Sequence, residues 1–247
     1  MRTETKRMLG GGIPASKHDR RVTQKTLRSR LQYLRYCPLC VAENIGAYGE
    51  VYWHRKHQLP GSYHCTKHEI RLVDSHVSTK QAAHWFFPAS EETKFDVVPA
   101  PMDIFDKHKD KSLKIGRESE WLLEHGLSVD WLENGRDKYL MLFRDSKMAS
   151  IYGTRGYPNM LSDAVNEYWG GDFLEELFLD IKTSPKWFTS IYINQATMSQ
   201  FMPLQHILLM CVAKGSVEDF VSSEVVRNPF GNPPYICENP ICEHYHT

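Results

Sequence analysis

The chain has 247 residues, of which 41% are hydrophobic and 24% charged, and its 30 Lys and Arg residues balance 30 Asp and Glu residues to a formal net charge of zero. This composition allows a sizeable core in one large or two small domains, and it excludes a disordered or fibrous protein. No apolar run approaches the roughly 18 residues that a membrane span needs, and the start, MRTETKRMLGGG, lacks the apolar core of a signal peptide, so we expect a soluble cytoplasmic protein without a membrane segment.

Positive charge is concentrated at the front of the chain. Residues 1–36 carry ten Lys and Arg residues against two acidic ones, and Gly10–Gly12 interrupts any helix begun before it. We therefore interpret residues 1–32 as a basic linker or arm, with a short helix over 22–32. Because nucleic-acid affinity comes largely from Lys and Arg, the arm is either a phosphate-contacting segment or a solvated connection. Its candidate phosphate contacts are Arg20, Arg21, Arg28 and Arg30.

Two short cysteine motifs follow the arm. Cys37 and Cys40 form a C-x2-C pair, and after 24 intervening residues Cys65 and His68 form a C-x2-H pair. Three thiolates and one imidazole are the ligand set of a closed structural zinc site, whereas catalytic zinc keeps one position open for water. Random placement rarely puts two such pairs this close together, which disfavours the alternative of buried thiols beside a surface histidine. The motifs predict one structural zinc ion.

The segment between the two pairs carries apolar residues at helical spacing. This spacing predicts a helix from Tyr48 to Gln58, which Leu59-Pro60-Gly61 would end. A small sheet is expected beside the metal, and its predicted strands are residues 62–64, 70–73 and 84–87.

His54 and His57 lie between the two pairs and are rival ligands. Since the four predicted ligands already complete a tetrahedral shell, we interpret His54 as a packed or phosphate-contacting residue rather than a ligand. The aromatic residues Trp53, Trp85 and Phe86 are expected to form the core of the small sheet rather than a platform for stacked bases.

The motifs YCP-x-C, YGE-x-YWHR-x-HQLPG and C-x2-H followed by an aliphatic pair resemble the zinc-finger domain of the TniQ family. Larger members of this family are called TnsD, and they choose the target site of heteromeric DNA transposons. GGDFLEEL at 170–177, MPLQHILLMCV at 202–212 and PYICENPICEHY near the end are similar to segments of the TnsD-type C-terminal half. The resemblance covers most of the chain from about Tyr33. Family members usually carry a helix-turn-helix before the finger, so the resemblance implies a fragment.

A connection over residues 90–114, marked by Pro99, Pro101 and the run KHKDKSLK, is expected to separate the finger from a helical half. Beyond it, apolar residues recur at helical spacing from Trp121 to Phe143, with Gly126 and Gly135 as stops. Cys211 falls in an apolar helix and is interpreted as a core residue. Further helices are predicted at 161–168, 172–179, 187–192, 203–213 and 217–222.

The helices at 161–168 and 172–179 are separated by two glycines, which is the length scale of a helix-turn-helix. Arg155 precedes them and is a candidate DNA contact, as are Thr154 and Asn159. A simple helical hairpin in the core is an equal alternative. Acidic residues in this half are expected to be solvated or to face a protein partner. They are Glu118, Glu120, Glu124, Glu175, Glu176 and Asp180.

The tail PYICENPICEHYHT carries a second Cys/His cluster. In a cytosolic chain these cysteines favour metal binding over disulfides. The C-x-H-x-H portion is too short to form a second knuckle comfortably, so we interpret the tail as half of a zinc site. In TnsD-like proteins, as the resemblance implies, a further cysteine pair downstream completes this finger, and the chain would therefore lack its distal part. The candidate ligands are Cys237, Cys242, His244 and His246.

The expected fold is mainly α, with short helices on a common core and a small zinc-finger α+β module. Its expected divisions are 1–32, a basic linker or arm; 33–98, a TniQ-type zinc-finger domain; 99–230, a helical TnsD-type domain; and 231–247, the start of a second Cys/His finger.

An enzyme is not expected. The sequence contains no H-E-x-x-H motif and no paired carboxylates near the cysteines, and no G-K-[ST] follows its glycine run. The resemblance implies a protein that binds double-stranded attachment-site DNA, recruits an AAA+ ATPase regulator and thereby the transposase, and takes no small-molecule substrate. The alternative is a zinc-stabilised protein-interaction module without direct DNA binding, which the zero net charge keeps open.

Overall fold

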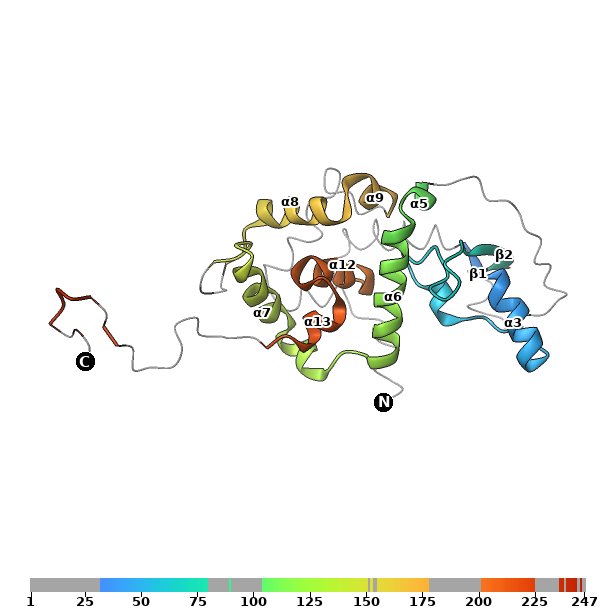
Figure 1. Cartoon of the computed structure of the whole chain (residues 1–247), viewed down its shortest axis with the longest axis horizontal. Coiled ribbons are helices and arrows are strands. Elements are labelled where there is room, and N and C mark those ends of the chain that lie inside the picture. Colours follow the sequence, from blue (N-terminus) through green and yellow to red (C-terminus); the bar gives the residue numbers. More distant parts are fainter. Residues whose placement is uncertain are drawn as a thin grey trace.

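The computed structural model describes residues 32–79, 89, 104–150, 152, 155–177, 201–224, 236–237, 239–243 and 245. These residues form a small finger module with a two-stranded sheet and a larger helical body (Figure 1). The described part of the chain is therefore mainly α with a small α+β module, as the sequence predicts. Helix α6 (Lys109–His125) stands between the finger module and most of the remaining helices (Figure 1).

The finger module is closed by two strands that are far apart in the sequence. Strand β1 (Tyr33–Tyr36) pairs antiparallel with β2 (Val73–Ser78), and Arg35 lies opposite Asp74. The Gln58 side chain accepts a hydrogen bond from the Arg35 backbone N–H at 2.8 Å and donates one to the Arg35 carbonyl at 2.6 Å. The loop between the strands is thereby fastened to the backbone of β1.

The helix of the finger lies earlier than predicted. Helix α3 spans Pro38–Tyr48 and begins with a proline, whose fixed φ suits the first helical position. It ends at Gly49, which has φ 75° and donates its N–H to the Ile45 carbonyl at 2.9 Å. The predicted helix over 48–58 is wrong, because only its last residues form a short 3-10 helix, η1 (Arg55–Gln58).

The predicted strands of the finger are only partly present. Of residues 62–64, His64 alone forms an isolated antiparallel bridge, with Arg71. Strand β2 starts at the last residue of the predicted strand 70–73. The predicted strand 84–87 lies outside the described residues.

The helical body packs around one central helix, α12 (Pro203–Lys214), which contacts α6, α7, α8 and α13 (Figure 1). Residues 204–211 are all buried, including Cys211 as predicted, so this helix is enclosed on every side. The indole Nε1 of Trp169 donates to the Leu208 carbonyl at 3.0 Å. The other helices are α5 (Ile104–Lys107), α7 (Val129–Asp145), α8 (Pro158–Trp169), α9 (Gly171–Glu176) and α13 (Val217–Ser222).

Most helices predicted in this half are confirmed. The predictions at 161–168 and 172–179 correspond to α8 and α9, and those at 203–213 and 217–222 to α12 and α13. The helix predicted at 187–192 lies outside the described residues. Within the described ranges, no helix is long and apolar enough to cross a membrane.

The two glycines predicted as helix stops behave differently. Gly126, with φ 73°, follows the last residue of α6 and ends that helix. Gly135 lies inside α7, so its prediction as a stop is wrong. Glycine inside a helix costs only about 1 kcal/mol. The buried residues Trp131, Tyr139 and Phe143 pack α7 into the core on both sides of Gly135. Packing therefore outweighs the backbone cost.

The predicted connection over 90–114 is mostly helical where it is described, from residue 104 onward, and residues 90–103 lie outside the described residues. Helix α6 begins inside that range and packs directly against the finger. A Cβ on Gly116 would lie 2.8 Å from Thr66 Cγ2, and one on Gly61 would lie 3.0 Å from Leu204 Cδ1. At such distances any residue larger than glycine would displace its neighbour. The finger is therefore packed closely against α6 and α12.

Two acidic residues of α6 form contacts with other parts of the molecule. The buried Glu118 carboxylate accepts the Val217 N–H at 2.7 Å and thus satisfies a donor at the start of α13. Glu120 forms an ion pair of 2.6 Å with Lys56 of the finger. The expectation that these two carboxylates are solvated or face a partner protein is therefore wrong, whereas Glu124 is exposed.

Candidate metal centre

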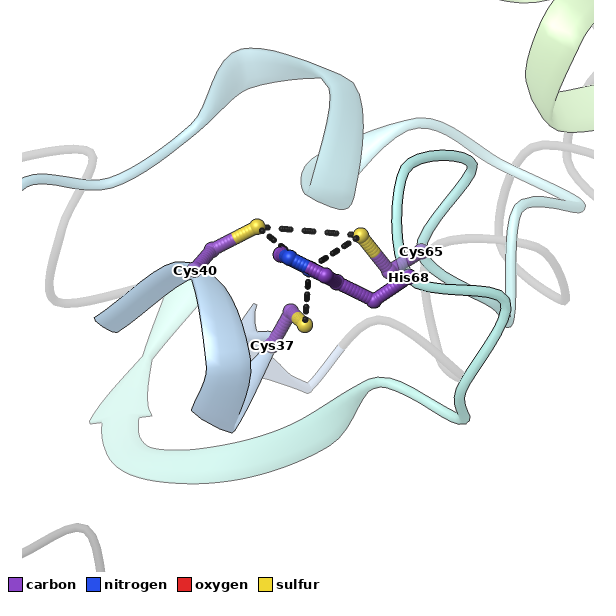
Figure 2. A group of neighbouring side chains, drawn as sticks. All are labelled: Cys37, Cys40, Cys65 and His68. Carbon is purple, nitrogen blue, oxygen red and sulfur yellow. Dashed lines mark hydrogen bonds between the residues drawn. The ribbon is translucent and has the colours of Figure 1, made fainter. Parts of the chain in front are cut away.

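Four side chains of the finger module converge on one point (Figure 2). Cys37 immediately precedes α3 and Cys40 lies in its first turn, while Cys65 and His68 belong to a tight turn before β2. In the turn, the Cys65 carbonyl accepts the Glu69 N–H at 2.8 Å, and Glu69 has φ 55°. Two short backbone loops, one from each motif, therefore present the four ligand atoms, and the structure brings together all four residues predicted as ligands.

Four of the distances between the ligand atoms fit one tetrahedral metal ion, and all four atoms lie within 4.8 Å of one another. His68 Nδ1 lies 3.3 Å from the Sγ atoms of Cys37 and Cys40 and 3.7 Å from that of Cys65. The Cys40 and Cys65 sulfurs are 3.7 Å apart. Bonds of about 2.3 Å to sulfur and about 2.0 Å to nitrogen give edges of roughly 3.5–3.8 Å in a tetrahedron. The group can hold a metal ion, and its donor set is the one that zinc prefers.

The three thiols need a nearby cation in order to be ionised together. Burial, together with neighbouring thiol groups, raises the pKa of Cys40 far above its ordinary value, and burial also raises the pKa of Cys37. Burial opposes ionisation of Cys65 too, but the N–H groups of His68 and Lys67 stabilise its thiolate and lower its pKa overall. Three thiolates this close are stable together only beside a positive ion, which replaces the lost hydration.

A carboxylate lies behind the histidine ligand. His68 Nε2 is 3.1 Å from Glu43 Oε1, and Lys67 Nζ is 2.5 Å from Glu43 Oε2. Hydrogen bonds from Lys67 and His68 lower the pKa of Glu43, so this carboxyl is ionised. Sequence reasoning missed Glu43. Its signal is a carboxylate one helical turn after Cys40, which has no meaning unless the helix is known to span Pro38–Tyr48 rather than the predicted 48–58.

His54 and His57 do not belong to the group of four ligands. His54 Nε2 is 3.1 Å from Asn44 Nδ2, and burial lowers the pKa of His54. His57 is buried against His54, with ring centroids 4.8 Å apart. Both residues are therefore packed inside the finger. Trp53 is half-buried, whereas Trp85 and Phe86 lie outside the described residues.

The tail cysteines are described only in part. Cys237 and Cys242 are half-buried thiols, and Cys237 forms an isolated bridge with Tyr245. The Cys242 N–H donates to the Asn239 carbonyl at 3.0 Å, which places the two cysteines on either side of a turn. Among the described residues, only the first cluster brings three or more potential ligands together. His244 and His246 lie outside the described residues, so the second zinc site stays a prediction.

Of the predicted nucleic-acid contacts, Arg155 and Asn159 are described. Arg155 is exposed in the connection before α8, and Asn159 is exposed in the first turn of α8. Thr154 and the four arginines of the N-terminal arm lie outside the described residues. The α8–α9 pair lacks the form of a DNA-reading helix-turn-helix, because α9 has only six residues and buries Phe173 and Leu174. Its exposed residues include the acidic Asp172 and Glu175, which DNA phosphates would repel.

A Ser-His-Asp constellation at the finger–helix contact was also missed. His64 Nδ1 lies 3.0 Å from Ser112 Oγ, and His64 Nε2 lies 3.4 Å from Asp106 Oδ1. In serine hydrolases the nitrogens are used the other way round, with Nε2 facing the nucleophile. Ser112 is fully buried, and its Oγ also accepts the Tyr63 N–H at 3.1 Å. The arrangement is a structural contact and offers no accessible nucleophile.

Two family models match the chain. The model described as TnsD, Tn7-like transposition protein D, matches residues 115–247, which is more than half of the chain. The TniQ model matches residues 6–72, which include all four residues of the metal cluster. This second match begins well before Tyr33 and so takes in the basic arm that the sequence motifs left out of the resemblance. No curated protein matches the chain closely enough to be named as a relative.

Proposed function

We propose, because this chain belongs to the family of Tn7-like transposition protein D, that it selects the DNA target site of a transposon. In this role the chain binds double-stranded attachment-site DNA, holds a structural zinc ion, and recruits an AAA+ ATPase regulator that engages the transposase. It performs no bond chemistry of its own. The observation that carries the proposal is the pair of family matches, which together span the finger module and the helical body.

The metal centre supports a structural rather than a catalytic role for the ion. Its three cysteines are at most 2% exposed, and three thiolates with one imidazole complete a tetrahedral shell. Such a shell leaves no position for a water nucleophile. The ion therefore shapes the finger, and α6 joins the finger to the helical body, so the two can present a single binding surface.

One described surface suits DNA phosphate. Lys147 and Arg155 are exposed on the hairpin between α7 and α8, where Ala149 bridges Gly156. Neither cation has an acidic partner among the described residues. Tyr152, which is 61% exposed, lies on the same hairpin. The first turn of α8 carries no acidic residue, so the positive end of the helix dipole adds to the two cations. The basic arm, inside the TniQ match, is the second source of positive charge.

The decisive experiment measures binding of the full chain to attachment-site and unrelated duplexes over a range of salt concentrations. Replacing Arg20, Arg21, Arg28 and Arg30 with Ala should weaken binding to both duplexes and reduce the slope of log K against log salt by up to about 3.6, because each phosphate contact contributes roughly 0.9. A footprint should show protection of the attachment site, and the AAA+ ATPase should join the complex only when the chain is bound there.

Arg155→Ala tests the surface of the hairpin between α7 and α8 alone. It should lower the slope of log K against log salt by about one unit. Arg117→Ala is its matched control, because Arg117 is an exposed arginine whose guanidinium is already paired with Glu69 at 2.6 Å. If neither the arm variant nor Arg155→Ala alters the slope, these side chains face solvent and the DNA surface lies elsewhere.

The second candidate is a zinc-stabilised protein-interaction module without direct DNA binding. It is favoured by the zero net charge and by the many cations already paired within the fold, such as Lys56 with Glu120. The two candidates differ in one result. A protein-interaction module would bind the ATPase in the absence of DNA and would show no salt-dependent affinity for either duplex.

A further inference from the structure

We propose that Glu43 is a positioning residue of the metal centre, which fixes the His68 ring so that Nδ1 faces the ion, and that Lys67 holds Glu43 in place. The inference rests on the proposed zinc ion but not on DNA binding. It concerns groups that lie behind the four ligands and that the family matches do not assign.

The two nitrogens of His68 have different surroundings. Nδ1 points into the cluster, 3.3 Å from the sulfurs of Cys37 and Cys40, whereas Nε2 lies 3.1 Å from Glu43 Oε1 (Figure 2 shows the ring among the sulfurs). A neutral imidazole carries one N–H and one bare nitrogen, and only the bare nitrogen can bind a metal. An ionised carboxylate only accepts hydrogen bonds, so Glu43 requires the proton to be on Nε2. Nδ1 is thereby left free to serve as the ligand.

Lys67 fixes the second oxygen of the same carboxylate. Its Nζ lies 2.5 Å from Glu43 Oε2, so each oxygen of Glu43 has its own partner. The side chains of Lys67 and Glu43 are 57% and 46% exposed. Exposed ion pairs of this kind contribute little to stability by themselves. The contact therefore matters for where the carboxylate is held, not for the strength of the pair.

Glu43 also joins the two halves of the site. It lies on α3, one turn after Cys40, whereas Lys67 and His68 belong to the second motif. The carboxylate bridges the motifs from outside the cluster. This bridge helps to hold the two motifs together around the ion, which reduces the ordering that metal binding must supply.

The test measures zinc affinity of the full chain by competition with a chromogenic chelator. Glu43→Ala should bind zinc about 10–100-fold more weakly, the range found when such supporting carboxylates are removed. Glu43→Gln keeps an oxygen that can accept from Nε2–H and should restore part of the affinity. Lys67→Met should have a smaller effect than Glu43→Ala, because it loosens the carboxylate without removing it.

Glu50→Ala is the matched control. Glu50 is an exposed glutamate two residues beyond α3, and its replacement removes the same charge from the same module. It should leave zinc affinity unchanged. An equal loss in Glu50→Ala and Glu43→Ala would mean that any nearby negative charge suffices, and this would overturn the positional role.

The protonation of the His68 ring gives a readout that a merely structural role would not move. In the zinc-loaded wild type, long-range proton–nitrogen spectra should show metal on Nδ1 and a fixed proton on Nε2. Glu43→Ala should broaden these signals through exchange, and Glu43→Gln should sharpen them again. Wild-type zinc affinity and unchanged His68 signals in Glu43→Ala would refute the proposal, as would a wild-type chain that binds no zinc.

Discussion

His64 Nδ1 lies 3.0 Å from Ser112 Oγ, and this contact joins the second metal motif to the long helix α6. His64 precedes the ligand Cys65 and is 2% exposed. Ser112 Oγ also accepts the Tyr63 N–H at 3.1 Å, and Tyr63 packs against the helical core. The finger and the helical body therefore share one buried interface, so we expect them to unfold together.

Ser112→Ala should destabilise the protein by about 1–3 kcal/mol, because a buried imidazole nitrogen and a backbone N–H would each lose their partner. Ser119→Ala is the matched control, since Ser119 is also buried on α6 but its hydroxyl donates only to the Ile115 carbonyl of its own helix, at 2.6 Å. Both variants gain the same helix propensity. Chemical denaturation should show a larger loss for Ser112→Ala, and equal losses would mean that the interface contact contributes nothing.

Gly116→Ala should destabilise the protein although alanine favours helices by about 1 kcal/mol over glycine. The new Cβ would lie 2.8 Å from Thr66 Cγ2, so the finger would be pushed away from α6. Gly46→Ala in α3 is the control: its Cβ would meet nothing within 4 Å, and we expect a gain in stability. Adding Thr66→Ala to Gly116→Ala should restore part of the loss. Thermal unfolding checks all of these variants, and a more stable Gly116→Ala would contradict the close fit.

Cys40→Ser should abolish tight zinc binding and unfold the finger. Structural zinc contributes on the order of 10 kcal/mol, which is comparable with the whole stability of a domain. Since the finger packs on α6, the melting transition of the helical body should also fall. Metal analysis together with far-ultraviolet circular dichroism measures both effects. Full zinc content with an unchanged melting temperature in Cys40→Ser would refute the assignment of the site.

His57 should make the finger sensitive to acid. Burial, with the positive charge of His54 and Lys56 nearby, lowers the pKa of His57 from 6.5 to about 3. The unfolded histidine takes up a proton near pH 6.5 while the folded one stays neutral, so its contribution to stability is complete above pH 6.5 and is lost as pH falls towards 3. At pH 5 the loss is about 2 kcal/mol.

His57→Phe should remove this component, and it breaks no hydrogen bond, because neither ring nitrogen of His57 has a partner in the described structure. The measurement is the free energy of unfolding of both proteins at pH 7, 6 and 5, with zinc content determined at each pH as the control. The same acid sensitivity in both proteins would show that other groups cause it.

The tail cysteines should hold a second zinc ion weakly. Cys237 and Cys242 lie on either side of a turn, and thiolates without a full ligand shell stay partly protonated and exchange metal easily. We expect one tightly bound zinc per chain, and the double variant Cys237→Ser, Cys242→Ser should keep it. Competition with a chelator gives the stoichiometry. Two tightly held ions in the wild type, one of them lost in the double variant, would instead assign a complete second site that includes His244 or His246.

The metal ligands were predictable because their signal is local. Two residues between ligands allow one tight turn to aim both side chains at the same ion, and this spacing is visible in the sequence. The buried helix α12 was predictable for a related reason, because its apolar residues form a continuous run that no exposed helix would carry. Helix α3 escaped prediction because it buries only Cys40 and Asn44 and therefore has no apolar stripe.

The sequence by itself determined the four residues of the metal cluster as candidate ligands, the helical character of the second half and the buried position of Cys211. Only the tertiary structure decided which distant residues meet: β1 with β2, His64 with Ser112, and Glu118 with the start of α13. These contacts join residues tens of positions apart. The strand pairing is made by backbone groups that every residue carries, and the other two contacts are each made by one side chain without periodic spacing. A carboxylate, a serine or a glycine is common on any surface, and its role arises only when packing brings a partner to it.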